Sequence, residues 1–384
     1  MTDKYEKIAK KMGSPWSPEI EKILKALFAE EEVEILLVFN GPYMDRFTAK
    51  KVAKKVKRPV EEVEPILLEM TRTQRVFSAV KDGIRTYSLF PLLPGLFELY
   101  FSNHERAAAE EKDTLMLFTE EYEKYYNEGH IVNSFNSTYP FMRVFVDQKV
   151  VDDTVERGKG KVVNVEQEVE QVKNDILPFE QAKAIVEKSH KISVMDCACR
   201  THMKIHNDGT PVNEYPINVC MAFNTTAGYC IEQGFGRELS KEEALETLSA
   251  AAKAGLVHTT QNITNKSMFI CNCDRDCCVM LKGIKLFNNP NVVASSNFLP
   301  EYNIENCVFC KKCTTICPMY TIELVDEETD DKRIVINYDR CIGCGVCAYN
   351  CPKGALTMVK KFDKIPAADS MEAAKRYMEG RIQQ

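Results

Sequence analysis

Two cysteine runs with identical spacing, between Cys307 and Pro352, constrain this chain more than any other feature. Each run reads C-x2-C-x2-C-x3-C-P, and together they contain Cys307, Cys310, Cys313, Cys317, Cys341, Cys344, Cys347 and Cys351. The short spacers allow three thiolates of one loop to face one cube of iron and sulfide, while the fourth cysteine lies beyond a turn. Zinc is the alternative, but zinc sites take their four ligands as two pairs, and a third cysteine at the same interval has no place in them. The paired runs therefore predict iron–sulfur binding.

Residues 301–360 resemble the bacterial-type ferredoxin domain that holds two [4Fe-4S] clusters. In that family the fourth cysteine of each run ligates the cluster of the other run. The resemblance therefore implies one cluster held by Cys307, Cys310, Cys313 and Cys351. It implies a second cluster held by Cys341, Cys344, Cys347 and Cys317.

The two cluster loops differ in the residues beside their ligands. Lys311 and Lys312 flank the first loop, and Gly343 and Gly345 flank the second. Nearby positive charge and exposed backbone N–H groups both favour a reduced cluster. The sequence therefore does not rank the two reduction potentials. An acidic stretch between the loops, residues 326–331, is interpreted as a solvated loop, with partner docking as the alternative.

Length and composition limit the class of protein. The 384 residues leave room for two or three domains, and 45% hydrophobic residues are enough to fill their cores. A net charge of -6 gives no overall attraction to nucleic acid or anionic lipid. The chain contains no apolar run of about 18 residues, so no membrane insertion is expected. Residues 1–11 are charged and lack an apolar signal core, so we expect a cytoplasmic protein in a reducing, oxygen-poor setting.

The N-terminal segment, residues 1–100, has a pattern of helices followed by a hairpin. Apolar periodicity predicts helices over 17–28, 33–39, 48–56 and 59–72, and Asp82-Gly83 predicts the turn of a hairpin over 76–89. This order resembles a winged helix-turn-helix. The helix in the recognition position carries Glu61, Glu62 and Glu64, which phosphate would repel, so a docking or structural role is expected instead of DNA binding.

Residues 101–176 are interpreted as a connector packed on the central domain. A charged amphipathic helix is expected over 110–127, and strands over 142–146 and 162–165 with a loop at 158–160. The last segment, residues 361–384, is predicted to be an amphipathic helix over 367–381.

The central segment, residues 177–300, delivers cysteines at the ends of two short predicted strands. The strand over 192–195 leads into Cys197 and Cys199, and the strand over 268–270 leads into Cys271 and Cys273. Residues i and i+2 of an extended chain point to the same side, so each pair is expected to aim two sulfurs at one point. Ser240 and Glu243 form a capping box that predicts a helix ending before Gly255.

Four interpretations of these central cysteines remain open. A third iron–sulfur cluster leads, because soft thiolates in this number suit iron–sulfur or zinc. A zinc site, a redox-active dithiol at Cys277-Cys278 and plain buried thiols are the others. The candidate ligands exceed four, so some are expected to be bystanders or two clusters are present: Cys197, Cys199, Cys220, Cys271, Cys273, Cys277 and Cys278.

Four other residues of the central segment have expected roles. Arg200 is expected to lower a thiolate pKa or to donate to a cluster sulfide, with a surface ion pair as the alternative. His202 and His206 are spaced i, i+4, and neutral, solvent-facing side chains are expected for them. Cys230 lies in a helical pattern and is expected to be a bystander.

Residues 190–360 contain, in order, the motifs C-x-C-R and C-x-C-x3-C-C and the two-cluster module. This arrangement resembles ferredoxin-domain proteins of anaerobic bacteria and archaea. That resemblance implies a redox class and no particular reaction. The expected fold is an α+β multidomain chain: a winged-helix-like domain (1–100), a connector (101–176), a central α/β Cys-rich domain (177–300), a two-cluster ferredoxin domain (301–360) and a C-terminal helix (361–384).

The sequence therefore predicts an oxidoreductase or an electron-transfer component of one. Single electrons would pass between a redox partner, either a flavoprotein or a metalloenzyme, and the central site through two [4Fe-4S] clusters. No G-x-G-x-x-G fingerprint follows a strand, so a flavin or nicotinamide would sit on the partner. Three alternatives stay open: a reductase that binds substrate at a central cluster, a redox-sensing DNA-binding regulator, and a reductive activator of a metalloprotein. A homodimer through the winged-helix-like domain or the last helix is a further expectation.

Overall fold

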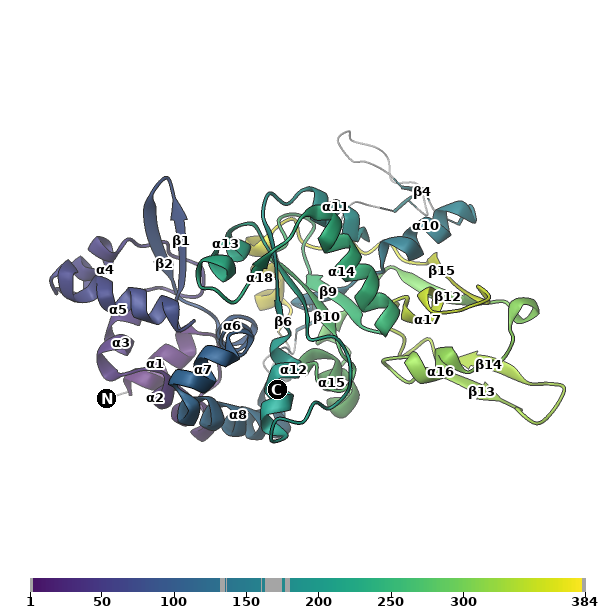
Figure 1. Ribbon diagram of the computed structural model, residues 1–384, viewed down its shortest axis with the longest axis horizontal. Coiled ribbons are helices and arrows are strands. Elements are labelled where there is room, and N and C mark those ends of the chain that lie inside the picture. The colour runs from purple at the N-terminus through teal and green to yellow at the C-terminus, as the bar shows by residue number, and fades with distance from the viewer. Residues whose placement is uncertain are drawn as a thin grey trace. The chain divides into compact units, whose positions relative to one another are not determined.

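The computed structural model describes residues 3–131, 135, 137–159, 161–162, 175–176 and 180–381. It contains both helices and sheets, with a ferredoxin-type domain toward the C-terminus (Figure 1). Contacts divide the chain into two compact units. The first unit comprises Met1–Ser134, Met195–Asn213 and Ala227–Arg237, and the second comprises Phe135–Val194, Glu214–Thr226 and Glu238–Gln384. This division is coarser than the five segments expected from the sequence, which stay a prediction.

The first unit begins with five helices and a hairpin. Their bounds are α1 Lys4–Lys11, α2 Pro18–Leu27, α3 Glu30–Leu36, α4 Ala49–Val56, α5 Val60–Arg72, β1 Phe77–Lys81 and β2 Ile84–Ser88. Ser17 caps α2 by accepting from the Ile20 N–H, and Pro18 occupies the first turn. Asp82 and Gly83 both have positive φ, as a two-residue hairpin turn requires. The elements agree with the expected pattern, while the assignment to the winged-helix class stays a prediction.

Short helices continue the first unit: α6 Phe97–Ser102, α7 His104–Glu110, α8 Lys112–Asn127 and α12 Ala198–His206, with the last part of α13 Asn224–Glu232. Aromatic rings from α6 and α8 surround His202 of α12, with centroids 4.9 Å from Phe101 and 5.2 Å from Tyr122. His202 is 1% exposed, and its Nε2 lies 3.2 Å from the Thr119 carbonyl oxygen. The expectation of a solvent-facing His202 was wrong, because its ring fills this aromatic core.

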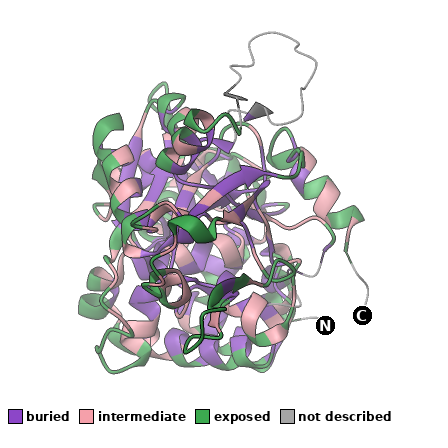
Figure 2. Cartoon of the chain, turned by 90° about the vertical axis from the view of Figure 1, so that its right-hand side faces the viewer, coloured by how far each residue is buried: buried purple, intermediate pink, exposed green. Residues whose placement is uncertain are grey.

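The second unit is built on a seven-stranded sheet with the order β11-β3-β9-β10-β7-β6-β8. The strands are β3 Met142–Val144, β6 Ile192–Asp196, β7 Asn218–Phe223, β8 Arg237–Glu238, β9 Val257–Gln261, β10 Phe269–Cys273 and β11 Val293–Ala294. The pairs β3–β9, β9–β10 and β10–β7 are antiparallel. All residues of β9 are buried, and Figure 2 shows strands in the buried colour. Strand β10 therefore pairs along both of its edges, with β9 on one side and β7 on the other.

Helices α11 Ala182–Glu187, α14 Lys241–Ala254 and α15 Val279–Phe287 accompany the sheet. As predicted, α14 begins with a capping box: Glu243 N donates to Ser240 Oγ at 3.1 Å, and Ser240 N donates to Glu243 Oε2 at 2.8 Å. It ends at Gly255, whose φ of +99° is left-handed. Apolar residues of α11, α14 and the sheet form one core cluster, which includes Val186, Leu248 and Ile270.

The ferredoxin module, residues 298–360, follows the sheet in the chain. Its elements are β12 Phe298–Tyr302, the 3-10 turn Ile304–Asn306, α16 Lys312–Ile316, β13 Ile322–Val325, β14 Arg333–Ile336, α17 Val346–Tyr349 and β15 Leu356–Lys360. β12 pairs with β15 and β13 with β14, both antiparallel. The β13–β14 hairpin leads away from α16 in Figure 1. Phe298 and Met358 of this module share a core cluster with Val146, Val150 and Val151.

The helix α10 Gln148–Glu156 supplies two of those valines and was missed in the sequence. Asp147 caps it by accepting from the Lys149 N–H at 2.8 Å, which is a recognisable start signal. The strand expected over 142–146 ends at Val144, and of the one expected over 162–165 only Val162, in the short β4 Lys161–Val162, lies in the described residues. β4 pairs with β5 Asp175–Ile176. The last helix, α18, spans Ser370–Glu379.

Within the described residues, no helix is both long enough and apolar enough to cross a bilayer.

The end of α14 predicts a measurable stability difference. A Cβ added at Gly255 would lie 2.8 Å from Ile316 Cγ1 of α16. Gly255→Ala should therefore lose about 1–2 kcal/mol for the left-handed backbone and a further amount for the steric contact. Urea unfolding followed by circular dichroism measures the loss. Gly209→Ala is the control, because Gly209 also has a left-handed φ of +83° but no atom within 4 Å of its added Cβ. Equal losses in the two variants would contradict the tight packing of Ile316 on Gly255.

Candidate metal centres

The structure gathers the eight cysteines of the two runs around two separate cavities. Site 1 is the cavity lined by Cys307, Cys310, Cys313 and Cys351. Site 2 is the cavity lined by Cys317, Cys341, Cys344 and Cys347. Each cavity thus takes three cysteines from one run and the fourth from the other, which is the grouping expected from the ferredoxin resemblance. Four thiols around one cavity fit a [4Fe-4S] cluster, which requires four thiolate ligands.

The two loops share one backbone conformation but not one composition. Phe309 and Lys311 in the first loop have φ values of 53° and 60°, and Gly343 and Gly345 at the equivalent positions have 67° and 76°. Glycine is required at 343, since an added Cβ would lie 2.2 Å from the Phe298 carbonyl oxygen. At 345 the added atom would lie 3.2 Å from Val146 Cγ1. The second loop is packed tightly against other segments of the same chain, around Phe298 and Val146. The first loop has room for side chains at the equivalent positions.

Backbone N–H groups point at the cysteine sulfurs of both sites. The Phe309 N–H donates to Cys307 Sγ at 3.4 Å, and the Thr321 N–H donates to Cys317 Sγ at 3.4 Å. Thr321 Oγ1 also lies 3.3 Å from Cys317 Sγ. Such hydrogen bonds stabilise negative charge on sulfur, as a ligating thiolate requires.

The two sites differ in burial. Cys310 of site 1 is exposed, while Cys317 and Cys347 of site 2 are buried. Burial raises the pKa of Cys344 and Cys347 far above the ordinary thiol value. Burial, followed by the neighbouring Cys307, raises the pKa of Cys313 to about 11. Site 2 is therefore the more strongly desolvated of the two.

In the central domain, three thiols meet on two adjacent strands. Ile270 pairs with Met221, so the antiparallel register brings Cys271 opposite Cys220. Cys273 follows two residues later on the same face of β10. The thiol of Cys271 interacts with those of Cys220 and Cys273 as hydrogen-bond partners, and these contacts, followed by burial, raise its pKa well above the usual value. Thr259 Oγ1 lies 3.2 Å from Cys273 Sγ. The expected convergence of the second C-x-C pair is thus seen in β10.

Asn272, between the two cysteines, explains why this strand keeps its register. Its side chain points to the other face, where Oδ1 accepts from His258 Nδ1 at 2.6 Å and Nδ2 donates to the Val219 carbonyl oxygen at 2.5 Å. His258 Nε2 in turn lies 3.4 Å from Asp147 Oδ2. Asn272, His258 and Asp147 are all buried. This buried network ties β10 to β9 and β7, and so places the three thiols together.

The vicinal pair Cys277-Cys278 lies just beyond β10. Both side chains are buried, and Cys278 is the residue before the first turn of α15. Its N–H donates to the Asp274 carbonyl oxygen at 3.1 Å.

The first C-x-C pair does not have the geometry expected of it. Cys197 is extended and precedes α12, but Cys199 already lies in the first turn of that helix. The two sulfurs are therefore not side by side on a strand, because the chain turns into a helix after Cys197. Both residues belong to the first unit, whereas the other candidate cysteines of the central segment belong to the second. Arg200 is 6% exposed, so the alternative of a surface ion pair was wrong.

Glu98 was not identified from the sequence. It lies on α6, and Gly95 N donates to its Oε2 at 2.6 Å. Burial raises the pKa of this carboxyl to about 7; hydrogen bonds from the Gly95 and Glu98 backbone oppose the shift, and the charge of Cys197 contributes to it. No motif marks this residue, so only the fold reveals it. Cys230, the expected bystander, is buried in α13, where an added Cβ at Gly236 would lie 2.7 Å from its Cβ.

In the part of the chain that the structure describes, no group of three or more His, Cys, Asp or Glu side chains is arranged to hold a single metal ion.

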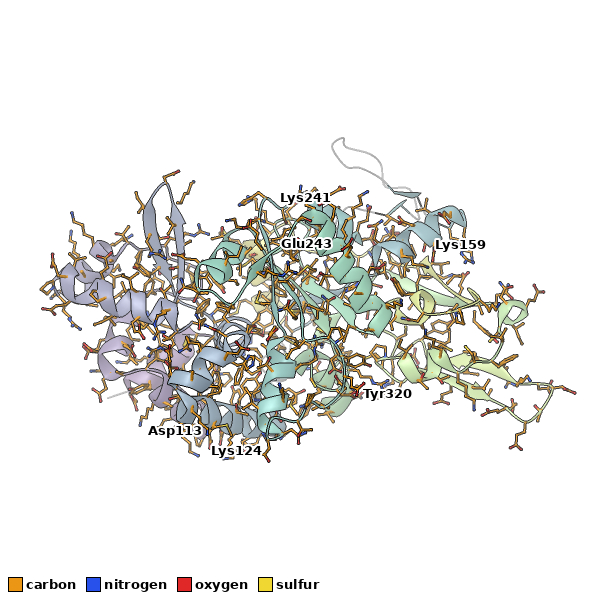
Figure 3. The ribbon with its side chains drawn as sticks, in the orientation of Figure 1. Asp113, Lys124, Lys159, Lys241, Glu243 and Tyr320 are labelled. Atoms are coloured by element: carbon orange, nitrogen blue, oxygen red, sulfur yellow. The ribbon has the colours of Figure 1, made fainter. Side chains whose placement is uncertain are left out.

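The ferredoxin module contacts the central domain beside these thiols, within the second unit. Arg275 Nη1 donates to the Thr315 carbonyl oxygen at 2.5 Å, and Tyr320 Oη donates to Asp276 Oδ1 at 3.4 Å. The Arg275 guanidinium lies 5.2 Å from the Tyr320 ring centroid, and Lys285 Nζ of α15 lies 5.3 Å from it. Figure 3 shows Tyr320 near α15. Asp276 precedes Cys277, and Tyr320 follows Cys317 by three residues, so this contact links the two cysteine regions along the chain.

The Asn272 network predicts how the central thiols are held. Asn272→Ala would leave His258 Nδ1 and the Val219 carbonyl oxygen without this partner, at a cost of about 1–3 kcal/mol. We expect a lower urea midpoint, together with faster alkylation of the half-buried Cys220 and Cys271 by iodoacetamide. Asn265→Ala is the control, because that amide is exposed and bonds only the adjacent Thr264 side chain. Unchanged alkylation rates in Asn272→Ala would show that the network does not hold the thiols in place.

Comparison with known proteins places the module in a family. Residues 306–355 match the 4Fe-4S dicluster domain. NADH-quinone oxidoreductase subunit I of Pelobacter propionicus is 37% identical over 71 residues, which cover 16% of this chain and 38% of that protein. Pyruvate synthase subunit PorD of Methanocaldococcus jannaschii is 36% identical over 64 residues, which cover 17% of this chain and 70% of that protein. An uncharacterized ferredoxin of the same organism is 37% identical over 70 residues, or 18% of this chain and 39% of that protein.

The matched residues 306–355 include all eight cysteines that line sites 1 and 2. The similarity covers less than a fifth of this chain, so it concerns the module and leaves the remaining residues unassigned. Through that C-terminal module the chain belongs to the 4Fe-4S dicluster domain family, carries two [4Fe-4S] clusters and has an iron–sulfur electron-transfer function.

Proposed function

We propose that this chain passes single electrons between an external redox partner and its own central Cys-rich domain, through the two clusters of the ferredoxin module. Clusters of this kind supply one-electron steps when bound. Sites 1 and 2 would hold them through the two ligand sets described above. The observation that carries the proposal is the group of three thiols, Cys220, Cys271 and Cys273, in the same compact unit as the module.

The central thiols are proposed to hold an additional iron–sulfur cluster. The sulfurs of Cys220, Cys271 and Cys273 lie together on β7 and β10. Thr259 of the neighbouring strand β9 contacts Cys273, and His258 of β9 bonds Asn272 of β10. Soft thiolates in this number suit an iron–sulfur centre. Cys277, Cys278, Cys197 and Cys199 remain candidates for further ligands.

The contact between the module and the central domain supports electron exchange between them. Arg275 and Tyr320 bring the segment after Cys317 against the segment before Cys277. Asn350 Nδ2, next to Cys351, donates to the Ala252 carbonyl oxygen of α14 at 2.9 Å. These polar contacts and the packing of Ile316 at Gly255 fix the module on this domain.

The N-terminal helices and hairpin are proposed to dock a protein partner. Residues Glu61, Glu62 and Glu64 of α5 are exposed, and an acidic face of this kind repels nucleic acid. We further propose a cytoplasmic, oxygen-poor setting, since thiolate-held clusters are suited to reducing conditions.

Iron and acid-labile sulfide per chain, measured on anaerobically purified full-length protein, test the proposal. Two clusters correspond to about eight irons and a third raises the count to about twelve. We expect about twelve in the native chain and about eight in Cys271→Ser or Cys273→Ser, with the ferredoxin clusters retained.

Cys230→Ser is the matched control, because Cys230 is buried in α13 and lies outside the three-thiol group. It should leave the iron content unchanged. A count of about eight in the native chain, unaltered by Cys271→Ser, would remove the central cluster from the proposal.

A further inference from the structure

Resting on the proposed two-cluster function, we propose that sites 1 and 2 have different reduction potentials, with site 1 the higher. Three lysines line the site 1 cavity: Lys311, Lys312 and Lys353. Among the described residues that line site 2, none carries a charged side chain. One chain therefore presents two chemically matched ligand sets in two different electrostatic settings.

The lysines act on the reduced form. One-electron reduction adds a negative charge to a cluster, and nearby positive charge stabilises that added charge. Lys311 is partly neutralised because it forms an ion pair with Glu327. Lys312 and Lys353 form no ion pair with any described residue, so their charges remain available to site 1. Both side chains are exposed, and salt therefore screens part of their effect.

Burial acts in the same direction by disfavouring reduction at site 2. Ile342 and Val346, beside its ligands, are 5% and 2% exposed, and Met358 of β15 closes the cavity at 2% exposure. Removing water from around a charged group raises the free energy of the more highly charged form. The reduced cluster is the more highly charged form, so burial lowers the potential of site 2.

Hydrogen bonding to sulfur acts in the opposite direction, because N–H donors stabilise the added negative charge of a reduced cluster. Gly343 and Gly345 share the left-handed backbone of Phe309 and Lys311, so their N–H groups have the same local orientation in both loops. Site 2 receives more of these bonds, because the backbone N–H groups of Gly343, Val346 and Ala348 donate to its ligand sulfurs in addition to that of Thr321, whereas Phe309 donates at site 1. Gly343 therefore serves close packing and also gives site 2 a donor. The proposed ordering requires the lysine charges and the burial, which both place site 1 higher, to outweigh these neutral donors.

A redox titration of the anaerobic full-length protein, followed by electron paramagnetic resonance at low ionic strength, tests the ordering. We expect two one-electron waves for the ferredoxin module. Replacing both free lysines (Lys312→Gln with Lys353→Gln) should lower the upper wave and leave the lower one in place. The expected change is at least about threefold in the reduced-to-oxidised ratio, or roughly 28 mV at 59 mV per tenfold change. Added salt should shrink the effect.

Lys375→Gln is the matched control, because Lys375 lies on α18, pairs with Glu379 at 3.8 Å and lines neither cavity. It should move neither wave. Coincident waves in the native protein, or a double variant that moves the lower wave or neither, would overturn the ordering. Fewer than about eight irons per chain would instead overturn the two-cluster function itself, so the two failures are distinguishable.

Discussion

Sharing of thiolate ligands between two distant runs is the constraint on which the ferredoxin module depends. Cys317 lines the cavity of the second run, and Cys351 lines that of the first. Each cluster would therefore close a loop between the two halves of the module, which otherwise has two two-stranded antiparallel sheets and two helices of four and five residues. Metal ligation of this kind contributes directly to folding free energy. The same ligand exchange links the two sites through the chain, while the residues that line them differ.

The central domain is organised by alternation along a single strand. In β10 the two cysteines face one side and Asn272 faces the other, where it meets His258 and Val219. A strand exposes successive side chains to opposite faces, so one residue fixes the register while its neighbours present sulfur. A one-residue slip would exchange these roles. The buried polar network is therefore a requirement for the three-thiol group.

The sequence predicted some parts of this structure well, for physical reasons that can be named. The ligand sets follow from spacing, and α14 follows from a capping box and a terminal glycine, all of which are local signals. The α10 helix was missed, although Asp147 marks its start. Cys199 was placed on a strand although it begins a helix, since nothing in C-A-C-R distinguishes the two. Glu98, Arg275 and Lys353 have no motif, and only tertiary packing brings them to the thiols. The proposed ranking of the two sites by reduction potential also needed the fold. The sequence shows which residues flank each loop, but it does not show which loop is buried.

Anomalous diffraction at the iron edge from crystals of the anaerobic protein would test the shared-ligand arrangement most directly. The account predicts iron in both cavities, with Cys351 bound to the cluster of the first run and Cys317 bound to that of the second. Clusters held entirely within one run, or iron absent from either cavity, would contradict it.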